Sequence, residues 1–342
     1  MVSSARKKTA SSAGRKDARS VIDQLASDIT DGDRRSLARA ITLIESTRTD
    51  HRRQAEALVS TILPETGKSF RLGISGVPGV GKSTFIETFG LHLVETGHRV
   101  AVLAVDPSSP RTGGSILGDK TRMEKLSRKA VAFIRPSPSG GTLGGVARRT
   151  REAILCVEAA GFDVVLIETV GVGQSETAVA ELTDMFILLL APGGGDDLQG
   201  IKKGIVELAD LIVVNKADGD LAAAAERARR DYAAALHLLR PPAGIWRPKV
   251  LKCSAMDSNG IGDIWSEVSE FQRTAQETGN LDSRRADHAA DWMWDEVTET
   301  VMADLRSNAT VNAELKNLET KVRDGTLSPS QAARNILRHF SR

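Results

Sequence analysis

The octapeptide Gly76–Ser83, Gly-Val-Pro-Gly-Val-Gly-Lys-Ser, constrains the fold of this 342-residue chain more than any other segment. It follows the apolar run Phe70–Ser75 and precedes a helical stretch, so it predicts a strand, a glycine loop and a helix. Glycines let backbone N–H groups surround a phosphate without interference from Cβ atoms, and a lysine adds positive charge. The segment therefore predicts a phosphate-binding loop at the end of a buried strand.

Two side chains of this loop have specific expected roles. Lys82 is expected to contact the β- and γ-phosphates of a nucleotide, and the Ser83 hydroxyl group is expected to complete the coordination shell of Mg²⁺. The positions expected to bind nucleotide here are Gly76, Val77, Pro78, Gly79, Val80, Gly81, Lys82, Ser83 and Thr84.

Short apolar runs bounded by Gly, Pro and Asp alternate with helical stretches through the middle of the chain, which is typical of buried parallel strands. The predicted strands are Phe70–Ser75, Val100–Val105, Val131–Ile134, Val164–Ile167, Met185–Leu190, Leu211–Val214 and Val250–Cys253. The predicted fold class is therefore α/β, a P-loop NTPase fold with a mostly parallel central sheet flanked by helices.

Helical periodicity predicts extensions on both sides of this domain. Apolar residues recur at helical spacing between residues 21 and 62 until Pro64, which predicts two or three helices. The strands cease at about Asn280, and helices are predicted after it at Trp292–Leu305, Ala309–Arg323 and Pro329–Phe340. The expected organisation is a basic disordered tail (1–20), an N-terminal helical extension (21–66), the P-loop domain (67–280) and a C-terminal helical arm (281–342). Periodicity alone is compatible with an arm that completes the core and with one that contacts another subunit.

The tetrapeptide Asn215–Asp218, Asn-Lys-Ala-Asp, follows the apolar run Leu211–Val214 and so lies at the end of a predicted strand. A carboxylate at this position can accept hydrogen bonds from the ring N–H and the exocyclic amine of guanine. Adenine lacks that pair of donors and would leave the carboxylate unpaired, at a cost of about 1–3 kcal/mol. We therefore expect guanine rather than adenine, contacted by Asn215, Lys216 and Asp218.

The next predicted strand ends at the tetrapeptide Cys-Ser-Ala-Met, residues 253–256. We expect Ser254, Ala255 and Met256 to lie where a backbone N–H can meet the guanine carbonyl. This short motif is informative only because it follows the phosphate loop and the Asn-Lys-Ala-Asp motif in order.

Carboxylates also follow two of the predicted strands. Glu168 ends the strand Val164–Ile167 and is placed to hold Mg²⁺ through water, while Gly171 lets its amide approach the γ-phosphate. Asp106 ends the strand Val100–Val105 and is a second carboxylate at the same edge. Ligands of open α/β sheets bind beyond the carboxyl ends of the strands, so the motifs are expected to converge on one crevice. The residues predicted to be catalytic are Lys82, Glu168 and Asp106, and the loops predicted to respond to the γ-phosphate are Asp106–Arg122, Gly171–Thr177 and Pro192–Lys203.

Bulk properties exclude several classes of partner. A net charge of +2 argues against a dedicated nucleic-acid binder. No apolar segment reaches the ~18 residues of a membrane span, and residues 1–20 do not resemble a signal peptide, so a cytoplasmic protein without a membrane partner is expected. Cys156 and Cys253 lack a C-x-x-C spacing and are predicted to be buried, and no two histidines have the spacing of metal ligands.

Taken together, these residues resemble the MeaB/ArgK family of P-loop GTPases, the bacterial relatives of the human methylmalonic aciduria type A protein. The resemblance covers about residues 20–340, including the N-terminal helices and the region around Trp292. It rests on Gly76–Thr84, residues 104–109, 111–123 and 135–138, Glu168–Glu176, Pro192–Lys203 and Asn215–Asp218.

The resemblance implies a GTPase that binds GTP, GDP and Mg²⁺ and acts as a chaperone of adenosylcobalamin-dependent methylmalonyl-CoA mutase. Such proteins gate cofactor loading and protect or reactivate the mutase. The family pattern places Ser83, Asp106, Asp119 and Glu168 around Mg²⁺. It makes Pro192–Lys203 a third switch loop that signals to the mutase, with Asp196 and Lys202 at matching positions, and it implies a homodimer built by the C-terminal arm.

Two other functions are weighed against this one. An ATP-dependent kinase that serves lysine, arginine and ornithine transport would prefer ATP, against which Asp218 argues. A metal-delivery chaperone related to the nickel-insertion GTPases would need a cluster of Cys and His ligands, which the sequence lacks. No residue is plainly a water-positioning glutamine or an arginine finger; Gln174 and Arg111 are candidates only. We therefore expect slow intrinsic hydrolysis, accelerated when the mutase reorganises the switch loops.

Overall fold

A seven-stranded parallel sheet forms the centre of the protein in the computed structural model, which describes residues 19–105, 123–136, 143–169, 175–193, 203–239 and 246–340. The strands are β1 (Phe70–Gly76), β2 (Val100–Val105), β3 (Ala132–Arg135), β4 (Val164–Thr169), β5 (Met185–Leu190), β6 (Leu211–Val214) and β7 (Lys249–Lys252). Each of the seven predicted apolar runs forms a strand, with ends shifted by at most a residue or two. The predicted α/β fold with a parallel sheet is confirmed.

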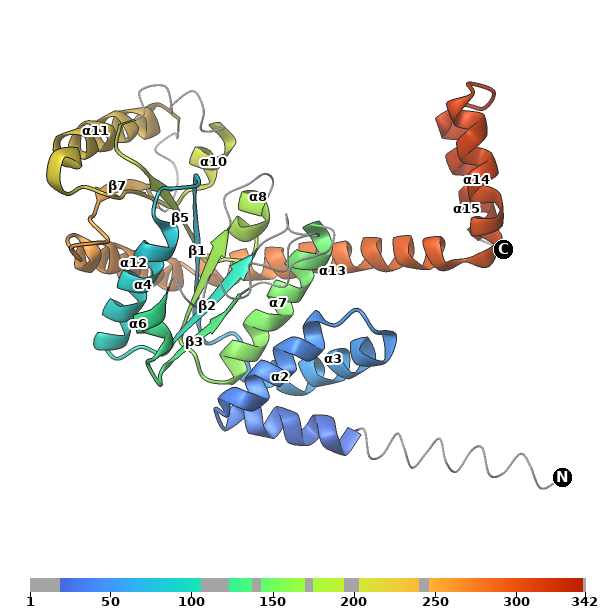
Figure 1. Cartoon of the computed structure of the whole chain (residues 1–342), viewed down its shortest axis with the longest axis horizontal. Helices are drawn as coiled ribbons and strands as arrows, with labels where there is room; N and C mark the ends of the chain where they lie inside the picture. Colours follow the sequence, from blue (N-terminus) through green and yellow to red (C-terminus); the bar gives the residue numbers. More distant parts are fainter. Residues whose placement is uncertain are drawn as a thin grey trace. The chain divides into compact units, whose positions relative to one another are not determined.

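The order of the strands is β3-β2-β4-β1-β5-β6-β7, and every neighbouring pair is parallel (Figure 1). The strand that leads into the glycine loop, β1, is therefore central, with β4 on one side and β5 on the other. Ile74 of β1 and Ala104 of β2 both pair with Glu168 of β4, and Gly76 pairs with Leu189 of β5. This register brings the carboxyl ends of the strands to one edge of the sheet.

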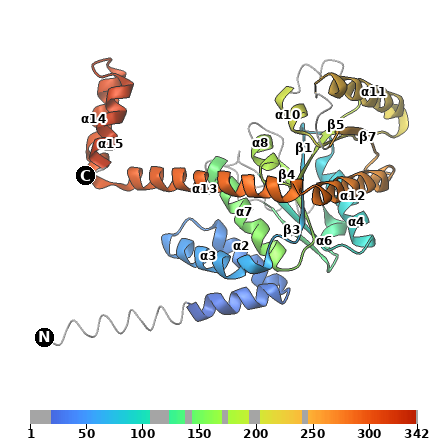
Figure 2. The ribbon, with the colours of Figure 1, turned by 180° about the vertical axis from the view of Figure 1, so that it is seen from behind.

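Helices cover both faces of the sheet (Figures 1 and 2). The helices α4 (Lys82–Glu95), α6 (Glu124–Ser127) and α12 (Ile261–Glu277) lie on one face. The other face carries α7 (Leu143–Ala159), α8 (Ser175–Ala180), α10 (Lys203–Leu208) and α11 (Ala222–Leu239), the last preceded by the 3₁₀ turn η2 (Gly219–Leu221).

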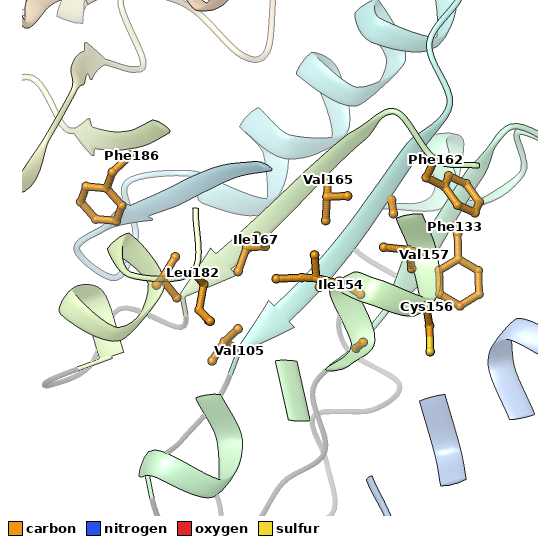
Figure 3. Packing of buried hydrophobic residues seen from close by; sticks show 14 of the residues in the cluster. Val105, Phe133, Ile154, Cys156, Val157, Phe162, Val165, Ile167, Leu182 and Phe186 are labelled. Atoms are coloured by element: carbon orange, nitrogen blue, oxygen red, sulfur yellow. The ribbon is translucent and has the colours of Figure 1, made fainter. Parts of the chain in front are cut away.

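Alternate residues of β4 enter different hydrophobic cores, as expected for a strand buried on both faces. Val164 and Leu166 belong to the core under α4 and α12, whereas Val165 and Ile167 belong to the core under α7. Figure 3 shows the second core, in which α7 places apolar side chains against β4. The rings of Phe133 and Phe162 lie in the same core, with centroids 6.0 Å apart.

The N-terminal extension contains three helices, the upper of the two predicted numbers. A helix runs through residues 19–30 of the described chain and is followed by α2 (Arg34–Glu45), α3 (Thr49–Ile62) and the 3₁₀ turn η1 (Leu63–Glu65), which contains Pro64. Asp33 caps α2, because its Oδ2 accepts a hydrogen bond from the Ser36 N–H at 2.8 Å. Arg135 at the end of β3 forms a salt bridge with Glu45 of α2. The buried apolar residues of the extension belong to the same core as those of α7, so the extension packs on the same side of the sheet.

At the amino ends of the strands, opposite the glycine loop, charged side chains form a partly buried network. The guanidinium of Arg285 donates to Asp184 Oδ1 and Oδ2 at 2.7 and 2.6 Å, and to the carbonyl oxygens of Gly67 and Ser69 at 2.7 and 2.6 Å. Glu158 accepts hydrogen bonds from the Arg71 Nε at 2.8 Å, the Ser69 hydroxyl at 2.5 Å and the Gly67 N–H at 2.8 Å. Burial raises the pKa of Glu158, but the hydrogen bonds and charge of Arg71 outweigh it and hold the pKa below its ordinary value.

The chain divides into two compact units, residues 1–285 and Ala286–Arg342. The three C-terminal helices are α13 (Asn280–Ser307), α14 (Ala309–Arg323) and α15 (Pro329–Phe340). The first begins at Asn280 rather than at the predicted Trp292. Within the described ranges, no helix is long and apolar enough to cross a membrane.

Candidate functional site

The glycine loop between β1 and α4 is shaped by close contacts that exclude a Cβ atom. A Cβ on Gly76 would lie 2.5 Å from the Leu189 carbonyl oxygen, and one on Gly81 would lie 2.8 Å from the Nδ2 of Asn215. Gly79 and Gly81 have φ angles of +82° and +92°, which side chains disfavour. The loop therefore needs glycine at these positions, and its backbone takes the left-handed turns that expose N–H groups.

Lys82, the first residue of α4, folds back over this loop. Its ammonium group donates to the Gly76 carbonyl oxygen at 2.6 Å and to the Val77 carbonyl oxygen at 3.3 Å. The residue is only 8% exposed, so its charge is held at the loop rather than in solvent. An ammonium group in this place is suited to binding phosphate oxygens. Thr84, in the same first turn, is exposed.

Ser83 and Glu168 lie together at the carboxyl edge of the sheet. The Ser83 hydroxyl donates to Glu168 Oε1 at 3.2 Å, and Glu168 is 6% exposed. These are two oxygen ligands of the kind that Mg²⁺ prefers, and they lie beside the phosphate loop, so the residues present fit this ion. The other two predicted ligands, Asp106 and Asp119, lie outside the described residues.

Asn215 connects the glycine loop with the residues that follow β7. Its Nδ2 donates to the Val80 carbonyl oxygen at 3.0 Å, and its Oδ1 accepts from the Ala255 N–H at 3.1 Å and the Cys253 thiol at 3.5 Å. The residue is 1% exposed. Its side chain is thus a structural bridge between two of the predicted loops, not a group that faces solvent.

Lys216 adds a second link between the same loops. Its φ of +58° turns the backbone sharply after β6, and its Nζ donates to the Gly79 carbonyl oxygen at 2.7 Å. Two residues later, Asp218 is half-buried. Burial, and after it the negative charge of Asp218, raises the pKa of the Cys253 thiol to about 12. The Ala217 N–H, one residue before Asp218, donates to the Cys253 carbonyl oxygen at 3.0 Å, so this part of the motif lies beside the end of β7.

The loop after β7 is held from several sides. Ser254 and Asn259 form an antiparallel bridge, the Ala255 N–H donates to Asn215, and the Ala255 carbonyl oxygen accepts from the Thr88 hydroxyl at 2.8 Å. Met256 is 80% exposed. The structure thus brings Ser254, Ala255 and Met256 beside the Asn-Lys-Ala-Asp motif.

Much of the predicted site is gathered on one edge: the phosphate loop, Lys82, Ser83, Glu168, Asn215–Asp218 and residues 254–256. The loop Asp106–Arg122 lies outside the described residues, as do Gly171, Gln174, Asp196 and Lys202. Among the residues that the structure does describe, no group of three or more His, Cys, Asp or Glu side chains is placed to hold a metal ion.

Sequence reasoning missed Thr88 and the bridging role of Asn215. Thr88 belongs to no motif, since one threonine in an amphipathic helix carries no signal. Asn215 was predicted to contact nucleotide, but its bonds to Val80 and Ala255 depend on the packing of three separate segments.

Comparison with known proteins gives consistent matches. A family model described as "Methylmalonyl Co-A mutase-associated GTPase MeaB" matches residues 37–310. The mouse (Mus musculus) protein described as "Methylmalonic aciduria type A homolog, mitochondrial" is 50% identical over 93% of this chain and 79% of its own length. GTPase ArgK of Escherichia coli K12 is 49% identical over 89% of this chain and 92% of its own length. A crystal structure described as "LAO/AO transport system kinase" is 39% identical and has a TM-score of 0.75, and the match covers 94% of this chain and 98% of that chain.

Proposed function

This chain belongs to the MeaB family of methylmalonyl-CoA mutase-associated GTPases and is itself a P-loop GTPase, and we propose that it acts as a GTP-dependent chaperone of that mutase. In this role it gates the loading of adenosylcobalamin and protects or reactivates the mutase. The observation that carries the nucleotide part of the proposal is the bridge formed by Asn215 between the phosphate loop and the loop at Ala255. This bridge keeps the groups proposed to bind the phosphates and the base at fixed positions relative to one another.

In the proposed complex, the glycine loop and Lys82 bind the β- and γ-phosphates. Ser83 and Glu168, with Asp106 and Asp119, would hold Mg²⁺, and this ion would supply charge neutralisation at the phosphates. Phosphoryl transfer to water requires positioning and charge neutralisation more than covalent chemistry, and Lys82 is already held within the loop by its bonds to backbone carbonyls. Lys82→Ala is therefore expected to abolish GTP turnover.

The proposed base contact is tested by changing the hydrogen-bonding character of Asp218. The carboxylate accepts from both the N1–H and the 2-amino group of guanine, whereas an amide presents a donor to the 2-position. Asp218→Asn is therefore expected to weaken GDP binding and to favour xanthosine diphosphate, with an unchanged unfolding midpoint. Isothermal titration with GDP, XDP and ADP measures this, and ADP binding as tight as GDP binding in the unmutated protein would refute the proposal.

The proposed coupling to the mutase is tested by steady-state GTP hydrolysis with and without purified mutase. We expect slow hydrolysis by the protein alone and faster hydrolysis when the mutase is added. If GTP turnover were unchanged at a saturating concentration of mutase, the proposed coupling would be refuted, while the GTPase assignment would stand.

A kinase function is the second candidate, because the solved structure with a TM-score of 0.75 is described as a transport system kinase. It predicts transfer of the γ-phosphate of ATP to a protein. Incubation with radiolabelled ATP and with radiolabelled GTP separates the two: label retained on protein supports a kinase, and label released as phosphate from GTP alone supports the GTPase.

We also propose that α13 contributes to a homodimer. Its second half carries large apolar side chains that are exposed in the single chain, among them Trp294, which is 63% exposed. The others are Met293, Val297, Val301 and Met302. Spacings of three and four residues put Trp294, Val297 and Val301 on one side of the helix. Trp294→Glu is expected to lower the molar mass measured by light scattering from dimer to monomer, and an unchanged mass would exclude this surface.

A further inference from the structure

Thr88 makes a contact that its place in the sequence does not suggest. It lies in the middle of α4, and its hydroxyl donates to the carbonyl oxygen of Ala255, 167 positions away, at 2.8 Å. Threonines in or directly after a helix commonly donate to a carbonyl of that helix, as Thr96, the residue after α4, does to the His92 carbonyl oxygen at 3.0 Å. Thr88 instead joins the helix of the phosphate loop to the loop after β7.

This hydrogen bond fixes the orientation of one peptide group. The Ala255 carbonyl and the Met256 N–H belong to the same peptide unit, which is planar and trans, so the two groups point in opposite directions. A donor on α4 that holds the carbonyl therefore directs the Met256 N–H away from α4. The preceding peptide unit is held independently, because the Ala255 N–H donates to Asn215.

The Met256 N–H is also the amide of this segment that is left for a ligand. The amides of Ser254, Ala255 and Asp257 donate to acceptors within the protein, at 3.0, 3.1 and 3.1 Å. Over the described ranges, the Met256 N–H donates no hydrogen bond to another residue. The residue as a whole is 80% exposed, so it is open to a ligand.

We infer that Thr88 is a positioning residue for base recognition, which aims the Met256 N–H at the 6-carbonyl oxygen of guanine. The inference rests on the proposed binding of guanine nucleotides. The 6-carbonyl is adjacent in the base to the N1–H assigned to Asp218, and the loops that carry Met256 and Asp218 are joined through Asn215 and by the hydrogen bond from the Ala217 N–H to the Cys253 carbonyl oxygen at 3.0 Å. Thr88 thus links the phosphate side of the site to the base side.

The test compares Thr88→Val, which keeps the shape of the side chain but removes its hydroxyl, with Thr88→Ser, which keeps the hydroxyl. Thr96→Val is the matched control, because it removes the hydroxyl of the residue after α4, which donates only to carbonyl oxygens in the last turns of that helix. Each full-length variant is titrated with GDP, with 6-thio-GDP and with ADP. In 6-thio-GDP, sulfur replaces the 6-oxygen and both donors assigned to Asp218 remain.

Thr88→Val is expected to weaken GDP binding about threefold to tenfold, the range of one neutral hydrogen bond, and to change 6-thio-GDP binding less than twofold. Thr88→Ser and Thr96→Val should bind GDP as the unmutated protein does. Equal weakening of GDP and 6-thio-GDP, or unchanged GDP binding by Thr88→Val, would overturn the inference. An unmutated protein that does not prefer GDP to ADP would instead refute the proposed guanine specificity, so the two failures are distinguishable.

Discussion

Gly81→Ala tests the tight packing between the glycine loop and Asn215. The new Cβ would lie 2.8 Å from Asn215 Nδ2, and the residue would have to keep a φ of +92°. The left-handed backbone alone costs about 1–2 kcal/mol. Displacing Asn215 breaks its hydrogen bond to the buried Val80 carbonyl and adds roughly 1–3 kcal/mol, so unfolding should become easier by about 2–5 kcal/mol.

Gly97→Ala supplies the control, since Gly97 has a φ of +97° and no atom within 4 Å of the position of its Cβ. This variant carries the backbone cost without the contact, so it should lose only about 1–2 kcal/mol. Urea unfolding followed by tryptophan fluorescence measures both variants, and GDP titration measures the site. We expect weaker GDP binding for Gly81→Ala only. If the two variants were equally stable and bound GDP equally well, the contact with Asn215 would not be a constraint on the loop.

Three further predictions concern charge, thiols and metal. The folded-state pKa of Glu158 lies below its ordinary value of 4.5, so the stabilisation that Glu158 provides is complete above pH 4.5 and is lost as the pH falls further. Glu158→Gln should remove this pH dependence and lower the free energy of unfolding by about 3–5 kcal/mol at pH 7. If the pH profile of the urea unfolding midpoints were the same in the variant, this role of Glu158 would be excluded. Burial raises the pKa of the Cys253 thiol to about 12 and also raises the pKa of the Cys156 thiol. Ellman's reagent at pH 8 should therefore label both cysteines only when the protein unfolds. Rapid labelling of the native protein would contradict their burial. EDTA should stop GTP hydrolysis and added Mg²⁺ should restore it; turnover that persists in EDTA would count against the proposed oxygen ligands.

Six of the strands, β1 to β6, were predictable because they are buried almost throughout and therefore appear as apolar runs, whereas only Val250 is buried in β7. Their order was not, since it depends on which way each connection crosses the sheet, and Val100 and Val164 have no local feature that makes β2 and β4 neighbours. The early start of α13 was missed for a related reason: of residues 280–291, only Leu281 is buried, so the segment lacks the apolar period that predicted the later helix.

The site was predictable where its residues lie at or near the carboxyl ends of strands. Lys82 and Asn215 follow strands and Glu168 lies near the carboxyl end of β4, and parallel strands share one carboxyl edge, so their proximity follows from the fold class. The cross-links made by Asn215 and Thr88 were not predictable, because each joins segments that lie far apart in the sequence. Motifs therefore indicated which ligand to expect, while the side chains that orient the motifs are determined by tertiary packing.

The Arg285 contacts at the amino ends of the strands have a consequence for how this domain comes apart. One side chain holds both Asp184 and the carbonyl oxygens of Gly67 and Ser69, which are the residues that lead into β1. We therefore expect the segment before β1 and the start of α13 to unfold together. In a shortened chain that ends at Asn280, Asp184 would lack its counter-ion Arg285. The shortest chain that still unfolds cooperatively should therefore extend at least to Arg285.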